Sequence, residues 1–296
     1  MISGACVASN TVGKRLPHDR RPSDAPGDGE YLLVADHLTK TYKHTRWISR
    51  QSDPVVPGLR DVSLALRPSQ TLGVVGESGA GKSTLARCIA CLDLPDAGQV
   101  WLDGQNLLEL SSSDLRRARR QIQMIFQGSP ASLNPRFSAL EIVTEPAMIA
   151  GLSSKARRRE LGFAMIESVG LQRSDAHRGC SEFSGGQRQR LAIARALTLA
   201  PNVLILDESL TGLDLPIQAQ LVNLLSDLQV ALSISYIFIS HDLRLAAHVS
   251  DDLAVMQGGR IVEQGPADQV SNNPQHPHTR ELVAATARFE LHKEIR

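Results

Sequence analysis

The feature that most constrains this chain is the run Gly76-Glu77-Ser78-Gly79-Ala80-Gly81-Lys82-Ser83, which matches the pattern G-x-x-x-x-G-K-[ST]. Its glycines let the backbone bend tightly and turn N–H groups inward, which makes an anion-binding nest. A helix that starts near Lys82 would point the positive end of its dipole at the same place. Lys82 adds a point charge for β- and γ-phosphates, and the Ser83 hydroxyl is a hard oxygen ligand suited to Mg²⁺. The run therefore predicts a loop that holds the phosphates of a nucleotide.

The segments on either side of this loop have the character that such a loop needs. TLGVV (71–75) is a short apolar run that predicts a buried strand, and STLARCIACL (83–92) has helical spacing. Cys88 and Cys91 form a C-x-x-C within this helix, a spacing that also occurs in metal and redox sites. No second ligand pair at zinc spacing accompanies them, so we expect two small buried side chains.

A second chemically loaded segment is VLILDE (203–208), an apolar run that ends in two carboxylates. Asp207, at the strand end, can hold the hydration shell of Mg²⁺. The adjacent Glu208 can polarise an attacking water. A solvated strand terminus is the alternative, and the phosphate loop upstream favours the catalytic interpretation.

The rest of the chain predicts an α/β core. YLLVADHLTKTY (31–42) and LRDVSLAL (59–66) predict strands, with a loop between His44 and Pro57. Hairpins are expected at Asp103-Gly104 and Gly258-Gly259. The region 111–200 is mostly helix-like. VLILD and YIFIS (236–240) predict buried parallel strands, joined by a crossover helix over 217–228.

Composition narrows the function. The 296 residues carry a formal net charge of +1 and are 42% hydrophobic, which indicates an ordinary globular protein without the basic surface of a nucleic-acid binder. RRARR (116–120) and KARRR (155–159) could contact nucleic acid or lipid headgroups, but solvated helix faces are the simpler interpretation. No apolar run reaches eighteen residues, and the N-terminal segment lacks the apolar core of a signal peptide, so we expect a cytoplasmic location.

A third segment, Phe183-Ser184-Gly185-Gly186-Gln187-Arg188-Gln189-Arg190, begins another predicted helix. Ser184 is a favourable N-cap, and the two glycines leave backbone N–H groups open. This is a second anion-binding element on the chain, built without a lysine. A chain with one phosphate loop and a further phosphate contact suggests a composite site.

The stretch FSGGQRQRLAIARAL (183–197) resembles the ABC signature LSGGQ, and the order of Gln127, signature, Asp207, Asp214 and His241 is similar to that of ABC nucleotide-binding domains. The resemblance covers about residues 31–280. It implies a P-loop NTPase with a RecA-like core, an antiparallel β subdomain and a helical signature subdomain. We expect a flexible tail at 1–29, the ATP-binding domain at 30–270 with its helical subdomain at about 130–185, and a C-terminal extension at 271–296.

The resemblance also implies residue roles, with ATP and Mg²⁺ as the bound species. Glu208 resembles the catalytic base, His241 the switch histidine at the γ-phosphate, and Gln127 the glutamine that reaches Mg²⁺ and the attacking water. Mg²⁺ would be held by Ser83, Gln127 and Asp207. Nucleotide contacts are expected from an adenine-stacking aromatic residue, the phosphate loop, the signature and the aspartate that crosses a dimer: Tyr42, Gly76, Glu77, Ser78, Gly79, Ala80, Gly81, Lys82, Ser83, Thr84, Ser184, Gly185, Gly186, Gln187 and Asp214.

The chain departs from the family pattern at three points. Phe183 stands where the signature usually has Leu, and Ser209 follows Glu208 where Pro is common. Gly212 stands in Thr211-Gly212-Leu213-Asp214, where the family usually has Ala. The last two departures concern communication between sites rather than hydrolysis.

Several segments resemble the oligopeptide, dipeptide and nickel importer branch: PASLNPR (130–136), IQAQLVNLL (217–225) and NPQHPHTRELVAA (273–285), in which His278 replaces the branch's Tyr. The polar segment between Tyr42 and Pro57 is also typical of this branch. This implies an ATPase for peptide uptake at the cytoplasmic face of the inner membrane. The alternatives are a nickel or metal-chelate importer, an exporter, an ABC protein without a membrane partner, and a binding module that does not hydrolyse ATP.

The implied partners follow from the same branch. They are two permease subunits, a second ATPase subunit that forms a heterodimer more readily than a homodimer, and indirectly a solute-binding protein. Nucleic acid is not among them.

Overall fold

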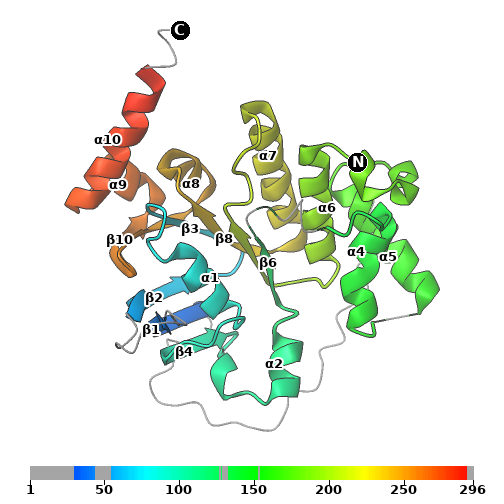
Figure 1. Cartoon of the computed structure of the whole chain (residues 1–296), viewed down its shortest axis with the longest axis horizontal. Helices are drawn as coiled ribbons and strands as arrows, with labels where there is room; N and C mark the ends of the chain where they lie inside the picture. Colours follow the sequence, from blue (N-terminus) through cyan, green and yellow to red (C-terminus); the bar gives the residue numbers. More distant parts are fainter. Residues whose placement is uncertain (1–29, 44–54, 127, 129–132, 153, 292–296) are drawn as a thin grey trace, which may run out of the picture.

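The computed structural model describes residues 30–43, 55–126, 128, 133–152 and 154–291. At its centre lies a six-stranded sheet in the order β10-β9-β3-β8-β7-β6 (Figure 1). Five of these strands run parallel, and β10 is antiparallel to β9. Its strands are β3 Thr71–Val75, β6 Ile122–Ile125, β7 Val203–Asp207, β8 Ser235–Ser240, β9 Asp252–Gln257 and β10 Arg260–Pro266.

A second sheet of four antiparallel strands lies at the end of the molecule where Figure 1 is coloured blue and cyan. Its order is β2-β1-β4-β5. The strands are β1 Leu33–Lys43, β2 Val55–Leu66, β4 Ala97–Leu102 and β5 Gln105–Asn106. The helices of the core are α1 Lys82–Ile89, α2 Ser112–Ala118, α7 Leu215–Leu232, α8 Leu243–Val249, α9 Ala267–Asn272 and α10 Pro277–Leu291.

The remaining helices form a cluster beside β6, drawn in green in Figure 1. They are α4 Ala139–Ile149, α5 Lys155–Ser168 and α6 Gly185–Leu197, with short 3-10 turns at Arg173–His177 and Cys180–Glu182. A further 3-10 turn, η1 Leu107–Glu109, follows β5 outside this cluster. A Ser N-cap opens each of the three helices: Ser138, Ser154 and Ser184. Among the described residues, no helix is long and apolar enough to cross a membrane.

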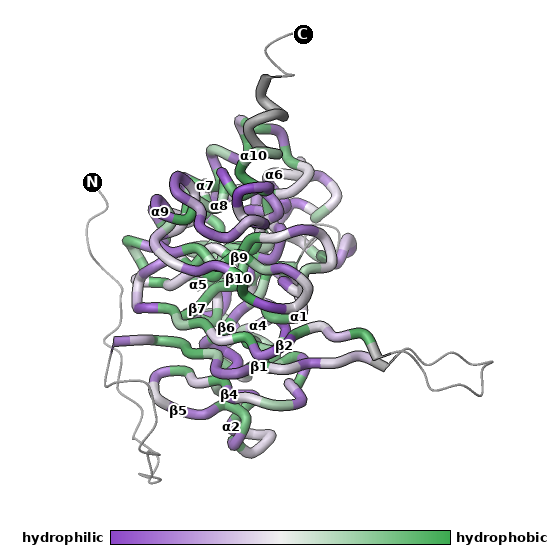
Figure 2. Tube along the Cα trace, turned by 90° about the vertical axis from the view of Figure 1, so that its left-hand side faces the viewer, coloured by the Kyte–Doolittle hydropathy of each residue, from purple (hydrophilic) through white to green (hydrophobic). Residues whose placement is uncertain are grey.

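The six-stranded sheet has a hydrophobic layer on each face, and Figure 2 shows the apolar segments running through its strands. Along β7 the buried residues alternate: Leu204 and Leu206 belong to one layer, Val203 and Ile205 to the other. Helix α1 packs in the layer of Val203 and Ile205, and α6 packs in the layer of Leu204 and Leu206. The helices that follow the two glycine-rich segments therefore lie on opposite faces of the sheet.

Most predicted elements are confirmed. β3 and β7 coincide with TLGVV and VLILD, and α7 contains the crossover helix predicted at 217–228. Both hairpins form, with Leu102 paired to Gln105 and Gln257 to Arg260. Helices α4 and α5 lie within about 130–185, and α10 lies within 271–296, while α9 spans the predicted boundary at 270; the domain boundaries stay a prediction. The predicted tail at 1–29 lies outside the described residues.

Two predictions were wrong in detail. The region 111–200 contains the strand β6, because Ile122 and Ile125 pair in parallel with the fully buried β7 and so complete the sheet edge. Strand β2 begins at Val55 rather than Leu59, so part of the predicted loop is strand. Three of the extra residues, Val55, Val56 and Pro57, pair with the end of β1, where Thr41 lies opposite Pro57. Pro57 is tolerated because β2 is an edge strand.

Cys88 and Cys91 are both fully buried in the layer around α1, as expected for small apolar side chains. Burial raises the pKa of the Cys88 thiol to about 12 and that of Cys91 to about 11. Thiols in this state are poor nucleophiles and poor metal ligands at neutral pH. The described residues include no cluster of three or more metal-ligating side chains.

Candidate functional site

The phosphate loop connects the carboxyl end of β3 to α1. The side chains of Glu77 and Ser78 at its tip are exposed, whereas Gly76 is buried. Gly81 adopts φ +103, and a Cβ added there would lie 2.4 Å from the Gly58 carbonyl oxygen. Only glycine fits this position, because any side chain would meet backbone and require a strained conformation. The loop is thus held against β2 with its tip open to solvent.

Lys82 begins α1 and is only 5% exposed. Its ammonium donates to the carbonyl oxygens of Gly76 at 2.7 Å and Glu77 at 2.9 Å, which places the charge inside the loop that it follows. Burial lowers the pKa of Lys82, and the carboxylates of Glu208 and Asp207 oppose that shift. A phosphate in the loop would supply the further negative charge that a buried ammonium needs.

Asp207, at the carboxyl end of β7, meets the phosphate loop across the sheet. Ser83 Oγ donates to its Oδ1 at 3.2 Å, although the two residues are 124 positions apart in the chain. Asp207 is 4% exposed. Burial raises the pKa of Asp207, and the Ser83 hydrogen bond only partly offsets it. A buried carboxylate beside a hydroxyl oxygen is a donor set that a hard divalent cation would complete.

Glu208 lies between the lysine and the histidine. Its Oε1 is 3.7 Å from Lys82 Nζ, and its Oε2 is 3.7 Å from His241 Nδ1. Its backbone has φ +45, a left-handed conformation that is strained for a side chain with a Cβ. The hydrogen bond from Glu208 N to the Ile239 carbonyl, at 3.0 Å, holds this conformation. The bend turns the second carboxylate of the pair back toward the loop.

His241 follows β8, and its side chain is about half exposed, at 54%. It opens on a cavity of about 110 Å³ that Glu208, Thr211 and Gln218 also line. In the sheet, β8 lies between β3 and β7, with Val75 opposite Ser240 and Asp207 opposite Ile239. The phosphate loop, His241 and the acidic pair formed by Asp207 and Glu208 therefore meet at one edge of the sheet, where the parallel strands have their carboxyl ends.

The signature segment forms the N-terminus of α6. Ser184 Oγ accepts from Gln187 N at 3.3 Å, and the Gln187 side chain accepts from Ser184 N at 3.0 Å, which is a capping box. The predicted N-cap is thus confirmed. In the described structure, no hydrogen bond engages the N–H groups of Gly185 and Gly186. A Cβ on Gly186 would lie 2.8 Å from Ile217 of α7, so the glycine also permits close helix packing.

Asp214 is the N-cap of α7, and its carboxylate makes no capping hydrogen bond. It is exposed, and it does not join the group formed by Lys82, Ser83, Asp207, Glu208 and His241. The departures at Ser209 and Gly212 lie in the same loop. Gly212 has φ +79, which suits glycine better than the family's usual Ala, and Ser209 is buried with its hydroxyl unpaired in the described structure.

The structure brings the phosphate loop together with the acidic pair and the histidine, and it leaves the signature and Asp214 apart from them. Tyr42 lies beside the loop, because its ring lies against Gly58 and its hydroxyl interacts with the Thr84 side chain. Gln127 lies outside the described residues. One positioning residue escaped sequence reasoning: Gln218 donates to the carbonyl oxygens of Leu210 and Leu213 and so fixes the loop before Asp214. Its only signal was an amide within the first turn of a helix.

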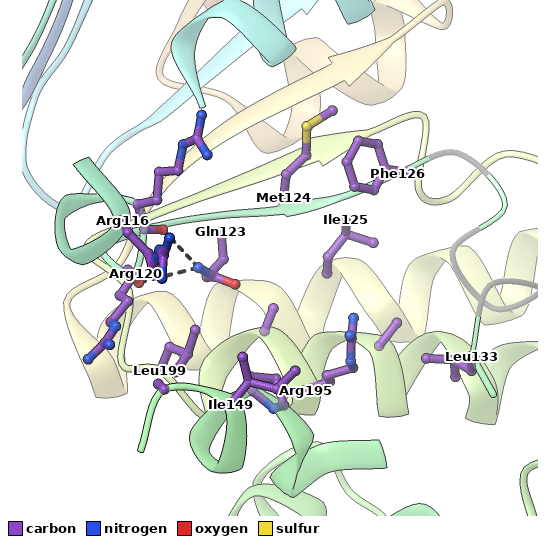
Figure 3. Close-up of a pocket in the computed structure, with 15 residues that line it drawn as sticks. Arg116, Arg120, Gln123, Met124, Ile125, Phe126, Leu133, Ile149, Arg195 and Leu199 are labelled. Carbon is purple, nitrogen blue, oxygen red and sulfur yellow. Dashed lines mark hydrogen bonds between the residues drawn. The ribbon is translucent and has the colours of Figure 1, made fainter. Parts of the chain in front are cut away.

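A separate cavity of about 560 Å³ lies between the sheet edge and the helical cluster (Figure 3). Met124, Ile125 and Phe126, in and just after β6, lie on one side, and Ile149 and Arg195 of α4 and α6 lie opposite. Arg116 and Arg120 add positive charge at one end. Two of its lining residues, Phe126 and Leu133, stand on either side of Gln127 in the sequence, and Gln127 itself lies outside the described residues.

Comparisons with known proteins agree with this geometry. Residues 59–211 match the ABC transporter family. The chain is 46% identical over 254 residues to a probable peptide ABC transporter ATP-binding protein, y4tS, of Sinorhizobium fredii, which covers 86% of this chain and 72% of that protein. It is 46% identical over 258 residues to the dipeptide transport ATP-binding protein DppF of Escherichia coli, covering 87% and 77%. The dimeric post-hydrolysis structure of the ATP-binding cassette MJ0796 with ADP and Pi superposes with a TM-score of 0.68 at 28% identity, over 79% of this chain and 98% of that one.

Proposed function

This chain belongs to the ABC transporter family, and we propose that it is the ATP-hydrolysing subunit of an importer that takes up dipeptides or oligopeptides. As a member of that family it is an ABC ATPase. One observation carries the proposed chemistry. Side chains that follow three different strands meet at one edge of the sheet. Ser83 is hydrogen-bonded to Asp207, and Glu208 lies within ion-pair distance of both Lys82 and His241.

Mg²⁺ fits the residues present. Ser83 Oγ and the buried Asp207 carboxylate form an oxygen pair whose charge lacks a full partner within the described residues. Gln127 is the third proposed ligand. When held by these residues, Mg²⁺ would supply positive charge that offsets the negative charge of the phosphates.

The proposed hydrolysis depends on this chain's side chains in turn. The N–H groups of the loop and Lys82 hold the β- and γ-phosphates of ATP. Glu208 orients water and accepts its proton as the water oxygen bonds to the γ-phosphorus. The bond from that phosphorus to the β–γ bridging oxygen breaks, so ADP is the leaving group, and His241 contacts the released phosphate. Lys82 Nζ and Glu208 Oε1 form an ion pair at 3.7 Å, and a phosphate in the loop would compete with Glu208 for the Lys82 ammonium.

The proposed active unit is a head-to-tail dimer. Helices α1 and α6 pack on opposite faces of the sheet, so the signature of one chain is turned away from its own phosphate loop. The open N–H groups at Gly185 and Gly186 would then serve the nucleotide of a neighbouring subunit, with Asp214 crossing the dimer. We propose a homologous subunit, rather than a second copy, as the neighbour.

We propose that membrane permease subunits contact the cavity of Figure 3 and that the ATPase is a peripheral subunit at the cytoplasmic face of the inner membrane. The cavity combines apolar side chains with arginines, and two residues that line it, Phe126 and Leu133, lie near Gln127 and Arg136 in the sequence, where we propose that the permeases make their contacts. A short amphipathic helix of a permease fits such a lining. A solute-binding protein would act only indirectly, through the permeases.

Peptide is the proposed cargo because the relatives quoted above are named for peptides and dipeptides. A nickel or metal-chelate importer is the alternative, based on the resemblance of HDLRL (241–245) to nickel systems. The decisive experiment reconstitutes the chain with its two permeases and binding protein in vesicles. Phosphate release should rise when the binding protein is loaded with a dipeptide. Stimulation by Ni²⁺ chelate instead of peptide would reject the proposed cargo, and absence of ATP hydrolysis would reject the proposed function.

A further inference from the structure

Tyr42, at the end of β1, is the residue proposed to stack on adenine, and its surroundings show how the ring is oriented. The ring lies so close to β2 that a Cβ on Gly58 would be 2.8 Å from Tyr42 Cε2 and 3.0 Å from the Thr84 methyl group of α1. Lys40 lies over the ring, 5.8 Å from its centroid. The tyrosine remains 38% exposed. One edge of the Tyr42 ring therefore lies against Gly58, and the Lys40 ammonium lies over one face. The exposed part of the ring remains accessible to a ligand.

The phenol group interacts with the Thr84 side chain and is also held by a residue outside every motif discussed above. Tyr42 Oη donates to Asp93 Oδ2 at 3.0 Å. Arg87 grips the same carboxylate with two hydrogen bonds, from Nε to Oδ2 at 2.8 Å and from Nη2 to Oδ1 at 3.2 Å. The Arg87 guanidinium, followed by the Tyr42 hydroxyl, lowers the pKa of Asp93. The carboxylate is therefore ionised at neutral pH and accepts from both neighbours at once.

Arg87 ties this network to the phosphate-binding helix. It lies in the last turn of α1, the helix that Lys82 begins, so the contact runs from α1 through Arg87 and Asp93 to the ring. The segment between α1 and β4, which contains Asp93, is anchored to β1 by further hydrogen bonds. Lys40 donates to the Leu94 carbonyl at 2.6 Å, and Asp96 accepts from Thr41 N at 2.7 Å. The base-contacting and phosphate-contacting elements are thereby fixed relative to one another.

We propose that Asp93 is a positioning residue for nucleotide binding, which rests on the proposed function as an ATPase. Held by Arg87, Asp93 immobilises the Tyr42 phenol so that the free part of the ring faces the adenine of an ATP whose phosphates lie in the loop. A tyrosine at a strand end has two side-chain torsions to restrict before it can stack, and this hydrogen bond restricts them in advance. Asp93 acts on the base alone and leaves the phosphate contacts to the loop.

The test compares ATP with inorganic tripolyphosphate, which lacks the base, by calorimetric titration of the full chain. Asp93→Ala should weaken ATP binding by about threefold to tenfold, the range expected for one aromatic contact, and leave tripolyphosphate affinity unchanged. Tyr42→Phe, which keeps the ring and removes the hydroxyl, should weaken ATP by a similar factor. The double variant should bind ATP no more weakly than Tyr42→Phe alone, since that variant already lacks the hydrogen bond to Asp93. In steady-state hydrolysis, KM for ATP should rise while kcat stays unchanged.

Asp114→Ala is the matched control, because it removes another aspartate from an arginine pair, with Arg117 on α2, and has no contact with Tyr42. It should alter neither ligand's affinity. Equal loss of ATP and tripolyphosphate binding in Asp93→Ala would mean that Asp93 only supports α1, and it would overturn the proposal. So would multiplicative effects in the double variant, or unchanged ATP affinity. A wild-type chain without affinity for ATP would instead overturn the proposed function itself.

Discussion

Two helices of this chain, α1 and α6, each present an N-terminus suited to an anion, but their surroundings differ. At α1 the chain supplies everything around the phosphate loop: Lys82 inside it, Asp207 against Ser83, and Glu208 between lysine and histidine. At α6 the chain supplies a capped helix end and two glycine N–H groups, and no hydrogen bond among the described residues joins these N–H groups to an acidic side chain.

The difference teaches that one chain contains two half-sites rather than one complete site. The two helices lie in separate hydrophobic layers on opposite faces of the sheet. A side chain at either helix end cannot be brought to the other without breaking a fully buried strand layer. The chemistry of α1 should therefore respond to substitutions differently from the closure function of α6, and the following substitutions measure that difference.

The largest expected effect is on turnover, at the catalytic half-site. Glu208→Gln removes the proposed general base and keeps the side-chain volume, so phosphate release should fall by about 10²- to 10⁴-fold while ATP binding persists. The same variant should accumulate as an ATP-bound dimer in size-exclusion chromatography. Hydrolysis at the wild-type rate would show that Glu208 is not the base.

The next effect is on nucleotide affinity. Lys82→Ala deletes a charge-assisted contact to phosphate, so ATP affinity measured by calorimetry should fall by about tenfold to a hundredfold. The melting temperature without nucleotide should not fall. Burial disfavours the charged form of Lys82 in the free chain, as its lowered pKa indicates, so removal of this ammonium does not destabilise the fold. Wild-type ATP affinity in this variant would contradict the role of the loop.

A smaller effect is expected at α6. Ser184→Ala breaks the capping box and should cost about 1 kcal/mol of stability. It should slow hydrolysis at high protein concentration without changing ATP affinity of the dilute chain, since the signature serves a neighbour. Ser138→Ala, which breaks the equivalent capping box on α4, is the matched control for stability. If both variants lost hydrolysis equally, Ser184 would act only as a helix cap and would have no role at the nucleotide of a neighbouring subunit.

The smallest effect concerns stability against pH. Burial raises the pKa of Asp207 in the folded chain, so the folded state holds this proton more tightly than the unfolded state. By linkage, this carboxyl contributes less stability as pH rises above about 4, the ordinary aspartate value. Asp207→Asn should therefore melt about 2 °C higher than wild type at neutral pH, with the advantage shrinking in acid. An advantage that is independent of pH would contradict a buried, ionising Asp207.

Particular elements show how far the sequence reaches. The strands TLGVV and VLILD could be placed to the residue because their apolar runs end at Gly76 and Glu208. The strand β6 was missed because IQMI is short and lies between helix-like segments; only its parallel pairing with β7 makes it a strand. The left-handed backbone of Glu208 carried no signal either, since its cause is a hydrogen bond to Ile239 of another strand.

The sequence by itself determined the local chemistry: which residues form a phosphate nest, which strand ends in two carboxylates, and which serine caps a helix. Spacing and residue type suffice for these, because each depends on a few consecutive backbone conformations. Only the tertiary structure decided that β8 lies between β3 and β7, that Asp207 meets Ser83, and that Asp93 reaches Tyr42. The two side-chain contacts join residues 124 and 51 positions apart, and long-range packing of strands, which no local pattern encodes, brings them together.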